Sequence, residues 1–287
     1  MERRLSHLGL FAVCSVAAAV GCAAPVGAEP DAGTSQKLSV VEVRAWHAVA
    51  DGSLTRLDAA ARFVSVREPG VPSDALDLLG LAWPNVPAGA CALTANDAPV
   101  PASPVRVDLR DLSPVTLLLE GTPVNLEPRA FPDVAGLVSG VVFVAPSELA
   151  APFSGARASA KSISLQMGQG LPAVSGLELP ELPSPLRVLD AVNNDGTFTV
   201  DARGVDILAA PARTDDRVVV EIMRAGVVRA RCGVDATGHL RMDSVALGGT
   251  GDATLIIRTQ RRVLRDDGIN PVDARLERAV ELRVFLR

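Results

Sequence analysis

The sequence predicts a mainly β chain: a signal peptide followed by two antiparallel β-sandwich-like domains, of which the second is immunoglobulin-like. Three observations support this prediction. Short apolar runs recur roughly every ten residues between glycine and proline turns, which is typical of sandwiches and barrels. Helical periodicity is almost absent, and residues 273–279 are the best helical candidate. Finally, the first segment of the chain differs in character from everything after it.

This first segment has the pattern of a secretory signal. Arg3 and Arg4 precede an apolar run from Leu8 to Val20 that ends in small residues. The run spans about thirteen residues, or ~20 Å as a helix, and roughly 20 residues are needed to cross a bilayer. A cleaved signal is therefore favoured over a permanent transmembrane anchor.

The end of the run, Ala19-Val20-Gly21-Cys22, resembles the lipobox of bacterial lipoproteins. In that family small or apolar residues precede a cysteine whose sulfur receives a diacylglyceryl group, and a peptidase then cuts before it. Ala19 occupies a position that is most often Leu in the family. The resemblance implies that residues 1–21 are a lipoprotein signal peptide and that Cys22 is the lipid-attachment site.

The resemblance also implies a location. Ala23 follows Cys22, and an Asp at that position commonly retains family members in the inner membrane, so we expect a lipid anchor in the outer membrane of a Gram-negative bacterium. Such an anchor holds firmly, because each buried methylene contributes about 0.8 kcal/mol. The alternative is ordinary cleavage after Ala28, where Val26-Gly27-Ala28 supplies small residues, and it leaves a periplasmic or secreted protein.

The mature chain divides by composition into a tether and two domains. Residues 22–37 are small and polar without periodicity, which predicts a flexible tether. Residues 38–180 predict an N-terminal β domain and residues 181–287 a C-terminal immunoglobulin-like sandwich, with the boundary at the proline-rich segment 179–186. Residues 183–188 resemble the start of fibronectin type III modules, although the early buried tryptophan of that family is missing. That resemblance implies architecture only.

Alternation of apolar and polar residues predicts the strands of both domains. In the first they are 38–45, 61–67, 105–110, 115–119, 124–126, 137–144 and 157–167. Residues 50–53 carry turn chemistry, and residues 74–82 fit either a short helix or a buried strand. In the second they are 186–189, 197–200, 217–223, 227–234, 240–242, 254–259 and 279–286, the number typical of an immunoglobulin-like sandwich.

Composition and motifs point away from several functions. The net charge of −5 gives nucleic acid no electrostatic reason to bind. His47 and His239 lie on expected strands of different domains, so we predict half-exposed strand residues and no metal site. Ser139 stands one place late for a G-x-S-x-G elbow and lies within an expected strand. The sequence therefore predicts no catalytic residue, no metal and no cofactor.

Two cysteines remain beyond Cys22. Export permits a disulfide between Cys91 and Cys232. However, the two residues lie far apart in the sequence and in different expected domains. The sequence therefore leaves open either a bridge or two separate thiols, because the Cα distance decides between them.

The remaining candidates for binding are arginines and tryptophans. Arg258, Arg261, Arg262 and Arg265 form a basic cluster, in which the first and third share one side of the strand and the other two share the opposite side. A solvated face is favoured there over an anionic partner. Trp46 and Trp83 are expected to pack in the core or in a loop, which leaves no aromatic platform for sugars.

We therefore expect a non-enzymatic exported lipoprotein that acts as a binding, adhesion or structural module of the envelope. Its partners would be the membrane, through the N-terminal lipid, and an unidentified envelope protein or glycan. The alternative is an exported hydrolase with a carboxylate-based site at the domain interface, since two well-placed carboxyl groups are sufficient for such chemistry. A cleft with paired acids would favour the enzyme, and acids spread over strand faces would favour the binding module.

Overall fold

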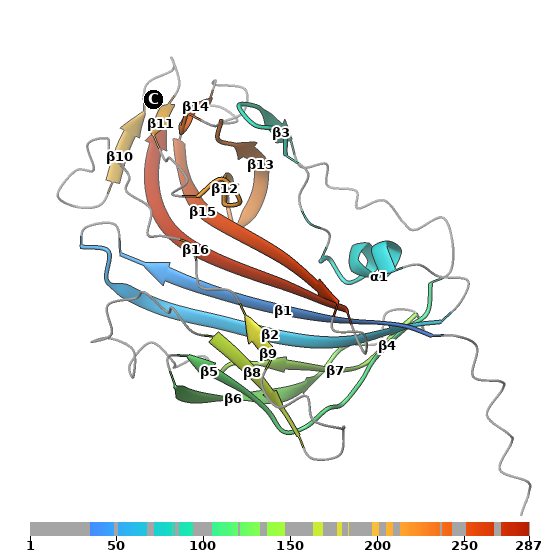
Figure 1. The fold of residues 1–287 in the computed structure, drawn as a ribbon. Helices are drawn as coiled ribbons and strands as arrows, with labels where there is room; N and C mark the ends of the chain where they lie inside the picture. The colour runs from blue at the N-terminus through green and yellow to red at the C-terminus, as the bar shows by residue number, and fades with distance from the viewer. Residues whose placement is uncertain are drawn as a thin grey trace, which may run out of the picture. The chain divides into compact units, whose positions relative to one another are not determined.

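The structure of the chain is a computed structural model (Figure 1). It describes residues 35–48, 51–67, 72–81, 83, 86–93, 105–119, 121–132, 137–146, 163–168, 177–179, 183, 197–200, 205–208, 213–235, 237–242, 251–266 and 271–286. Cys22 and the signal segment lie outside these residues. The described residues all belong to one unit, Thr34–Arg287.

The described residues form strands almost throughout, which confirms the prediction of a mainly β chain. The elements are β1 (Gln36–His47), β2 (Leu54–Val66), α1 (Pro72–Leu78), β3 (Cys91–Leu93), β4 (Val107–Leu109), β5 (Val115–Leu119), β6 (Thr122–Ala130), β7 (Val138–Val144), β8 (Ile163–Met167), β9 (Leu177–Leu179), β10 (Thr197–Val200), β11 (Val205–Leu208), β12 (Arg217–Arg224), β13 (Val227–Gly233), β14 (His239–Met242), β15 (Gly251–Asp266) and β16 (Pro271–Leu286). Residues 74–82, which fitted a helix or a strand, contain the end of α1.

The finer prediction of two separate antiparallel sandwiches is not confirmed. One sheet has the strand order β3-β13-β12-β15-β16-β1-β2-β4-β7-β6-β5-β8-β9, so it joins strands from both sides of residue 180. The junction is the pair β1–β16, which is parallel and sets Ser39 opposite Val272 and His47 opposite Val280. The pairs β4–β7 and β10–β16 are also parallel. No local sequence signal reports such long-range pairing.

The long hairpin of β15 and β16 makes this junction possible. The two strands pair from Gly251–Leu286 to Asp266–Pro271, and they run side by side in Figure 1. Residues 273–279, the best helical candidate, therefore lie in a strand, and the helical prediction is wrong. The reason is visible in the sequence, because Ala274 and Leu276 alternate with charged residues at the period of two that a strand requires.

The central strands β1, β2 and β16 have one apolar face, which we call the core face. Val41, Val43 and Phe63 on this face are buried against side chains of β5, β6 and β8, including Leu117 and Leu165. Figure 1 shows β5, β6 and β8 lying against β1 and β2. A second buried cluster continues the core face over β12, β15 and β16. Burying each large side chain contributes roughly 1.5–3 kcal/mol.

The opposite side of the same strands is the charged face, defined by the side chains of Glu42 and Arg44 on β1 and of Arg275 and Glu277 on β16. At the start of β1 this face is still apolar, because Ala75 of α1 packs there among buried valines and leucines. Further along, charged residues replace the apolar ones. The charged face carries the features described below.

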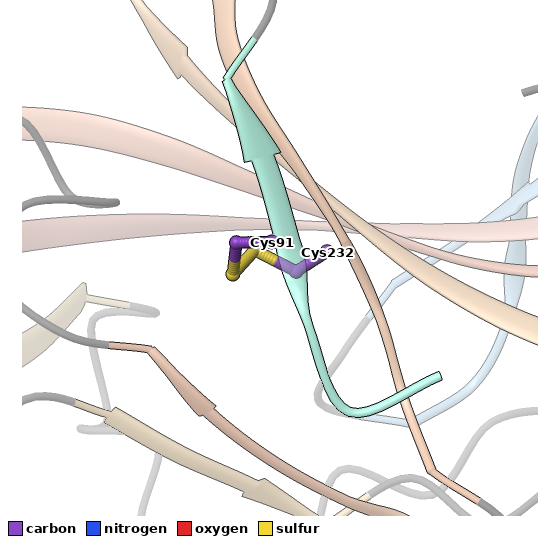
Figure 2. Close-up of a disulfide and its surroundings, with 2 residues drawn as sticks. All are labelled: Cys91 and Cys232. Atoms are coloured by element: carbon purple, nitrogen blue, oxygen red, sulfur yellow. A yellow bond between two sulfur atoms is a disulfide. The ribbon is translucent and has the colours of Figure 1, made fainter. Parts of the chain in front are cut away.

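Residues 81, 83 and 86–93, which we call the strap, begin against the charged face. The backbone oxygen of Leu81 accepts a hydrogen bond from Arg275 Nη1 at 2.5 Å, and that of Val86 accepts one from Arg217. At its end, β3 pairs with β13 and a disulfide joins Cys91 to Cys232 (Figure 2). Of the two alternatives that the sequence left open, the structure thus contains the bridge.

Candidate functional site

Two rows of alternating charge cross the charged face, and we call them the ion-pair rows. The first row crosses β13, β12, β15, β16 and β1 as Arg231, Glu221, Arg258, Glu277 and Arg44. Arg231 Nε lies 2.9 Å and Arg258 Nη2 2.7 Å from the Glu221 carboxylate. Glu277 lies between Arg258, at 4.0 Å, and Arg44, which donates to it through Nε. Every charge in this row faces an opposite charge on the next strand.

The second row runs across β15, β16, β1 and β2. Its members are Arg262, Asp273, Arg275, Glu42 and Arg62. Asp273 is fully buried, and it accepts two hydrogen bonds from Arg262, both at 2.9 Å, and others from Arg275 at 2.7 and 3.1 Å. Charge-assisted bidentate pairs of this kind are among the strong hydrogen bonds of proteins. The row is a structural device that satisfies charges which the fold has buried.

The rows shift the pKa values of their members in the directions that their surroundings require. Burial alone would raise the pKa of Asp273, but the hydrogen bonds and charges of Arg262 and Arg275 outweigh it and the pKa is lowered. Burial alone would lower the pKa of Arg44, and Glu277 reverses this, so the pKa is raised. Arg258 has a lowered pKa, because its burial and the charge of Arg44 outweigh its carboxylate partners.

Beyond the ion-pair rows the charged face is hollowed. The hollow has a volume of about 620 Å³, within the range of roughly 300–1,000 Å³ that ligand sites occupy. Its lining residues are Trp46, Arg56, Met223, Ala225, Gly226, Asp252, Ala253, Thr254, Ile256, Glu281, Arg283, Val284 and Phe285. An adjoining depression of about 250 Å³ shares Trp46, Arg56 and Glu281 with it.

The strand register explains how these side chains come together. Thr254 of β15 lies opposite Arg283 of β16, and Ile256 lies opposite Glu281. Met223 of β12 lies on the other side of Thr254. The apolar side chains form a floor, to which Phe285 adds a ring that is 45% exposed. The site therefore combines an apolar surface with a few polar groups.

The charges in the hollow differ from those in the rows. Asp252, Glu281 and Arg283 are all exposed, and within the described part of the chain none of their side chains takes part in a hydrogen bond or ion pair. They belong to both signs, two carboxylates and one guanidinium. Such groups are available to a ligand without first breaking a contact inside the protein.

Trp46 forms a wall of the hollow rather than an exposed platform. Its ring is 8% exposed, and its Nε1 donates a hydrogen bond of 2.6 Å to Asp58. The guanidinium of Arg56 lies 4.3 Å from the ring centroid, and that of Arg44 lies 5.8 Å from it. Trp83 in the strap packs in the same way, 5.6 Å from both Arg262 and Arg275. The prediction that both tryptophans pack internally or in a loop is confirmed.

A smaller cavity of about 300 Å³ gathers three carboxylates, those of Glu42, Asp58 and Glu277. Each of them is already engaged by an arginine: Glu42 by Arg62, Glu277 by Arg44, and Asp58 by Arg56 at 3.1 Å. The cavity is therefore lined by salt bridges, and each of its three carboxylates is paired with an arginine rather than with another carboxylate.

The basic cluster and the histidine differ from their predictions. The alternation of sides is confirmed, but the solvated position is found only at Arg265, which is exposed. Arg258 and Arg262 belong to the ion-pair rows, and Arg261, which is 3% exposed, forms a bidentate pair with Asp216 on the opposite side. His47 is buried rather than half-exposed, with Nδ1 3.0 Å from the Gly52 oxygen.

Burial and the neighbouring positive charge of Arg278 lower the pKa of His47. His239 belongs to β14, and its side chain lies outside the described residues. Ser139 lies within β7, as expected from the sequence. Cys22, the predicted lipid-attachment site, lies outside the described part of the chain.

Within the described ranges, no group of three or more His, Cys, Asp or Glu side chains is placed to hold a metal ion. In that same part of the chain, no helix has the length and apolar character needed to cross a membrane.

Comparisons with known proteins give little further information. No protein-family model and no curated protein sequence matches the chain. Among solved structures, one similar chain comes from work on host cell surface retention of a 1.5-MDa bacterial ice-binding adhesin, with 11% sequence identity and a TM-score of 0.19. The alignment covers 88% of this chain and 66% of that one. At these values the likeness carries no conclusion about function.

Proposed function

We propose that this chain is an exported, lipid-anchored, non-enzymatic binding module of the bacterial envelope, and that the hollow is its ligand site. The proposal is supported by a difference between two groups of charges on the charged face. The ion-pair rows satisfy their own charges, whereas Glu281, Arg283 and Asp252 have no partner within the described residues and surround an apolar floor. Apolar pockets with a few convergent polar groups are the usual form of a ligand site.

The anchor in this proposal rests on the residues around Cys22. Intact-mass analysis of protein extracted from membranes tests it, with wild type beside Cys22→Ala. We expect a wild-type mass that begins at Cys22 and includes acyl chains, and a variant that loses both the modification and membrane association. A free amino terminus at Glu29 that is the same in both proteins would instead indicate ordinary cleavage after Ala28.

The binding role is tested by thermal unfolding of the full chain with a panel of small ligands. The panel contains dipeptides, neutral disaccharides and soluble acyl chains, each at the same concentration. A ligand that binds only the folded state raises the midpoint. We expect at least one class to raise it for wild type and for Arg106→Gln, an exposed control outside the hollow, but not for Glu281→Gln/Arg283→Gln. If no class raises the midpoint, or if the double variant responds like wild type, the hollow is not the site.

The alternative, an exported hydrolase, has one specific candidate location, the cavity with Glu42, Asp58 and Glu277. Its salt bridges favour a structural role. The ligands from the thermal experiment provide the test, because they are recovered and analysed by mass spectrometry after incubation. A binding module returns them unchanged. Hydrolysis that is lost in Asp58→Asn, while binding at the hollow persists, would support the enzyme.

A further inference from the structure

We propose that the hollow recognises a zwitterionic ligand of the size of a dipeptide, with a free amino terminus and a free carboxylate. This inference rests on the proposed function, because it names the ligand class of the same site. It depends on the signs of the charges in the hollow, on their spacing along β16, and on the apolar floor between them.

The charges of the hollow favour a ligand that carries both signs. Glu281 and Asp252 would repel a polyanion, and Arg283 would repel a polycation, as would Arg56 at the edge of the site. A neutral ligand would leave these exposed charges without a counter-charge. A zwitterion gives each sign a partner, and hydrogen bonds between charged groups are about twice as strong as neutral ones.

The spacing of Glu281 and Arg283 sets the length of the ligand. The two residues stand at alternate positions of β16, so their side chains leave the same face and their Cα atoms are roughly 6.6 Å apart. Two extended residues span at most about 7 Å. A dipeptide lying along β16 therefore brings its amino terminus to Glu281 and its carboxylate to Arg283.

The neighbours of this pair fit the rest of such a ligand. Thr254 lies directly opposite Arg283 and supplies a hydroxyl donor to the same carboxylate. Ile256 is opposite Glu281, and Met223 and Phe285 border the same floor, so two apolar side chains of the ligand have surfaces to cover. A thioether and an aromatic ring accommodate side chains of different shape, which suits a site that selects termini rather than one sequence.

Isothermal titration of the full chain in detergent tests the inference. The probes are leucyl-leucine, its N-acetyl derivative, its C-terminal amide and the neutral disaccharide cellobiose. We expect leucyl-leucine to bind, and each blocked terminus to weaken binding roughly 10- to 100-fold, the usual value of a hydrogen bond to a charged group. Cellobiose is expected to give no heat.

Two variants assign each terminus to its partner by a double-mutant cycle. In Arg283→Gln the amide should bind about as well as the free dipeptide, while N-acetylation still weakens binding. Glu281→Gln should show the reverse pattern, and Arg106→Gln, exposed and outside the hollow, should behave as wild type. This crossed pattern is not expected from a general loss of stability.

The outcomes separate the inference from the proposed function. If free and blocked dipeptides bind with equal affinity, the hollow does not recognise a zwitterion. Binding of cellobiose that is lost in both variants would likewise contradict recognition of a zwitterion. In the latter case the hollow remains the ligand site. If none of the probes binds and the thermal panel also gives no response, both the ligand class and the binding role are wrong. Binding that neither variant changes places the ligand elsewhere and overturns the inference.

Discussion

Glu277 and Glu281 are the same residue type on the same face of the same strand, yet their surroundings are opposite. Glu277 is buried, accepts from Arg44, and receives a 2.7 Å hydrogen bond from Gln260 on β15. Glu281, four residues later, is exposed, lies opposite Ile256, and has no polar partner within the described residues. The length of β1 explains the difference, because its pairing with β16 ends at His47 and Val280.

This comparison separates charges that hold the fold from charges that are available to a ligand. Where a third strand continues beside β15 and β16, the carboxylates of β16 find arginines on β1 and β15. Where β1 ends, β10 pairs with β16 instead, from Thr197 opposite Arg283 to Val200 opposite Leu286, and its sequence Thr-Phe-Thr-Val contains no charged residue. The hollow is thus a consequence of strand length rather than of a special motif. Removal of a charge should therefore lower stability in the ion-pair rows and weaken ligand binding in the hollow.

The largest effect is expected from Asp273→Ala in the second ion-pair row. The substitution leaves the guanidinium groups of Arg262 and Arg275 without their shared carboxylate. Removing one partner of a buried ion pair costs about 3–5 kcal/mol, because an uncompensated charge remains. Urea unfolding should show this as a lower midpoint.

The matched control is Asp108→Ala, whose pair with Arg67 at 2.9 Å is exposed on both sides. Exposed pairs contribute about 0–1 kcal/mol, so its midpoint should change little. Equal midpoints for the two variants would contradict the structural role of the rows.

The second effect concerns the strap that lies against these rows. Reduction of the Cys91–Cys232 disulfide should lower the free energy of unfolding by about 2–4 kcal/mol, because the unfolded chain regains freedom. Urea unfolding with and without reductant measures it, and Cys91→Ser/Cys232→Ser should be insensitive to the reductant. Ligand affinity at the hollow should persist while the chain stays folded, since neither cysteine lines it. Loss of that affinity in the reduced folded protein would show that the two regions are coupled.

A third effect follows from the lowered pKa of Asp273. Its folded-state pKa lies below the ordinary value of 3.8, so its contribution to stability is complete above that value and is lost as pH falls through the folded-state pKa. Urea midpoints measured from pH 7 downwards should therefore fall faster for wild type than for Asp273→Asn. The difference between the two proteins should narrow below about pH 4. Parallel curves would mean that this carboxylate gains nothing from its arginines.

The elements that the sequence predicts well are short, mostly apolar runs bounded by glycine, proline or charged residues. β5, β7, β10 and β12 are of this kind, and the expected ranges match the observed ones closely. For β15 the sequence predicts only residues 254–259, because buried polar residues such as Gln260 and Arg261 interrupt its apolar pattern. These residues are satisfied by partners remote in sequence, for example Asp216 for Arg261, and no local pattern reports such partners.

The candidate site was harder to predict for the same reason. Alternation over 279–286 correctly places Glu281 and Arg283 on one face of a strand. It does not show that β1 stops short of them or that Thr254 and Ile256 lie opposite. The sequence likewise leaves the disulfide open, because the register that sets Cys91 opposite Cys232 depends on β3 joining the edge of β13.

The smallest effect on stability is expected at the hollow itself. Glu281→Gln and Arg283→Gln should each change the free energy of unfolding by less than about 0.5 kcal/mol, because exposed residues without structural partners contribute little. The same substitutions should weaken ligand binding strongly, as argued above. Urea midpoints measured beside Asp273→Ala give the direct contrast between the two regions. If either variant instead lost more than about 1 kcal/mol, its side chain would be part of the structural network, and the distinction between paired and available charges would fail at that residue.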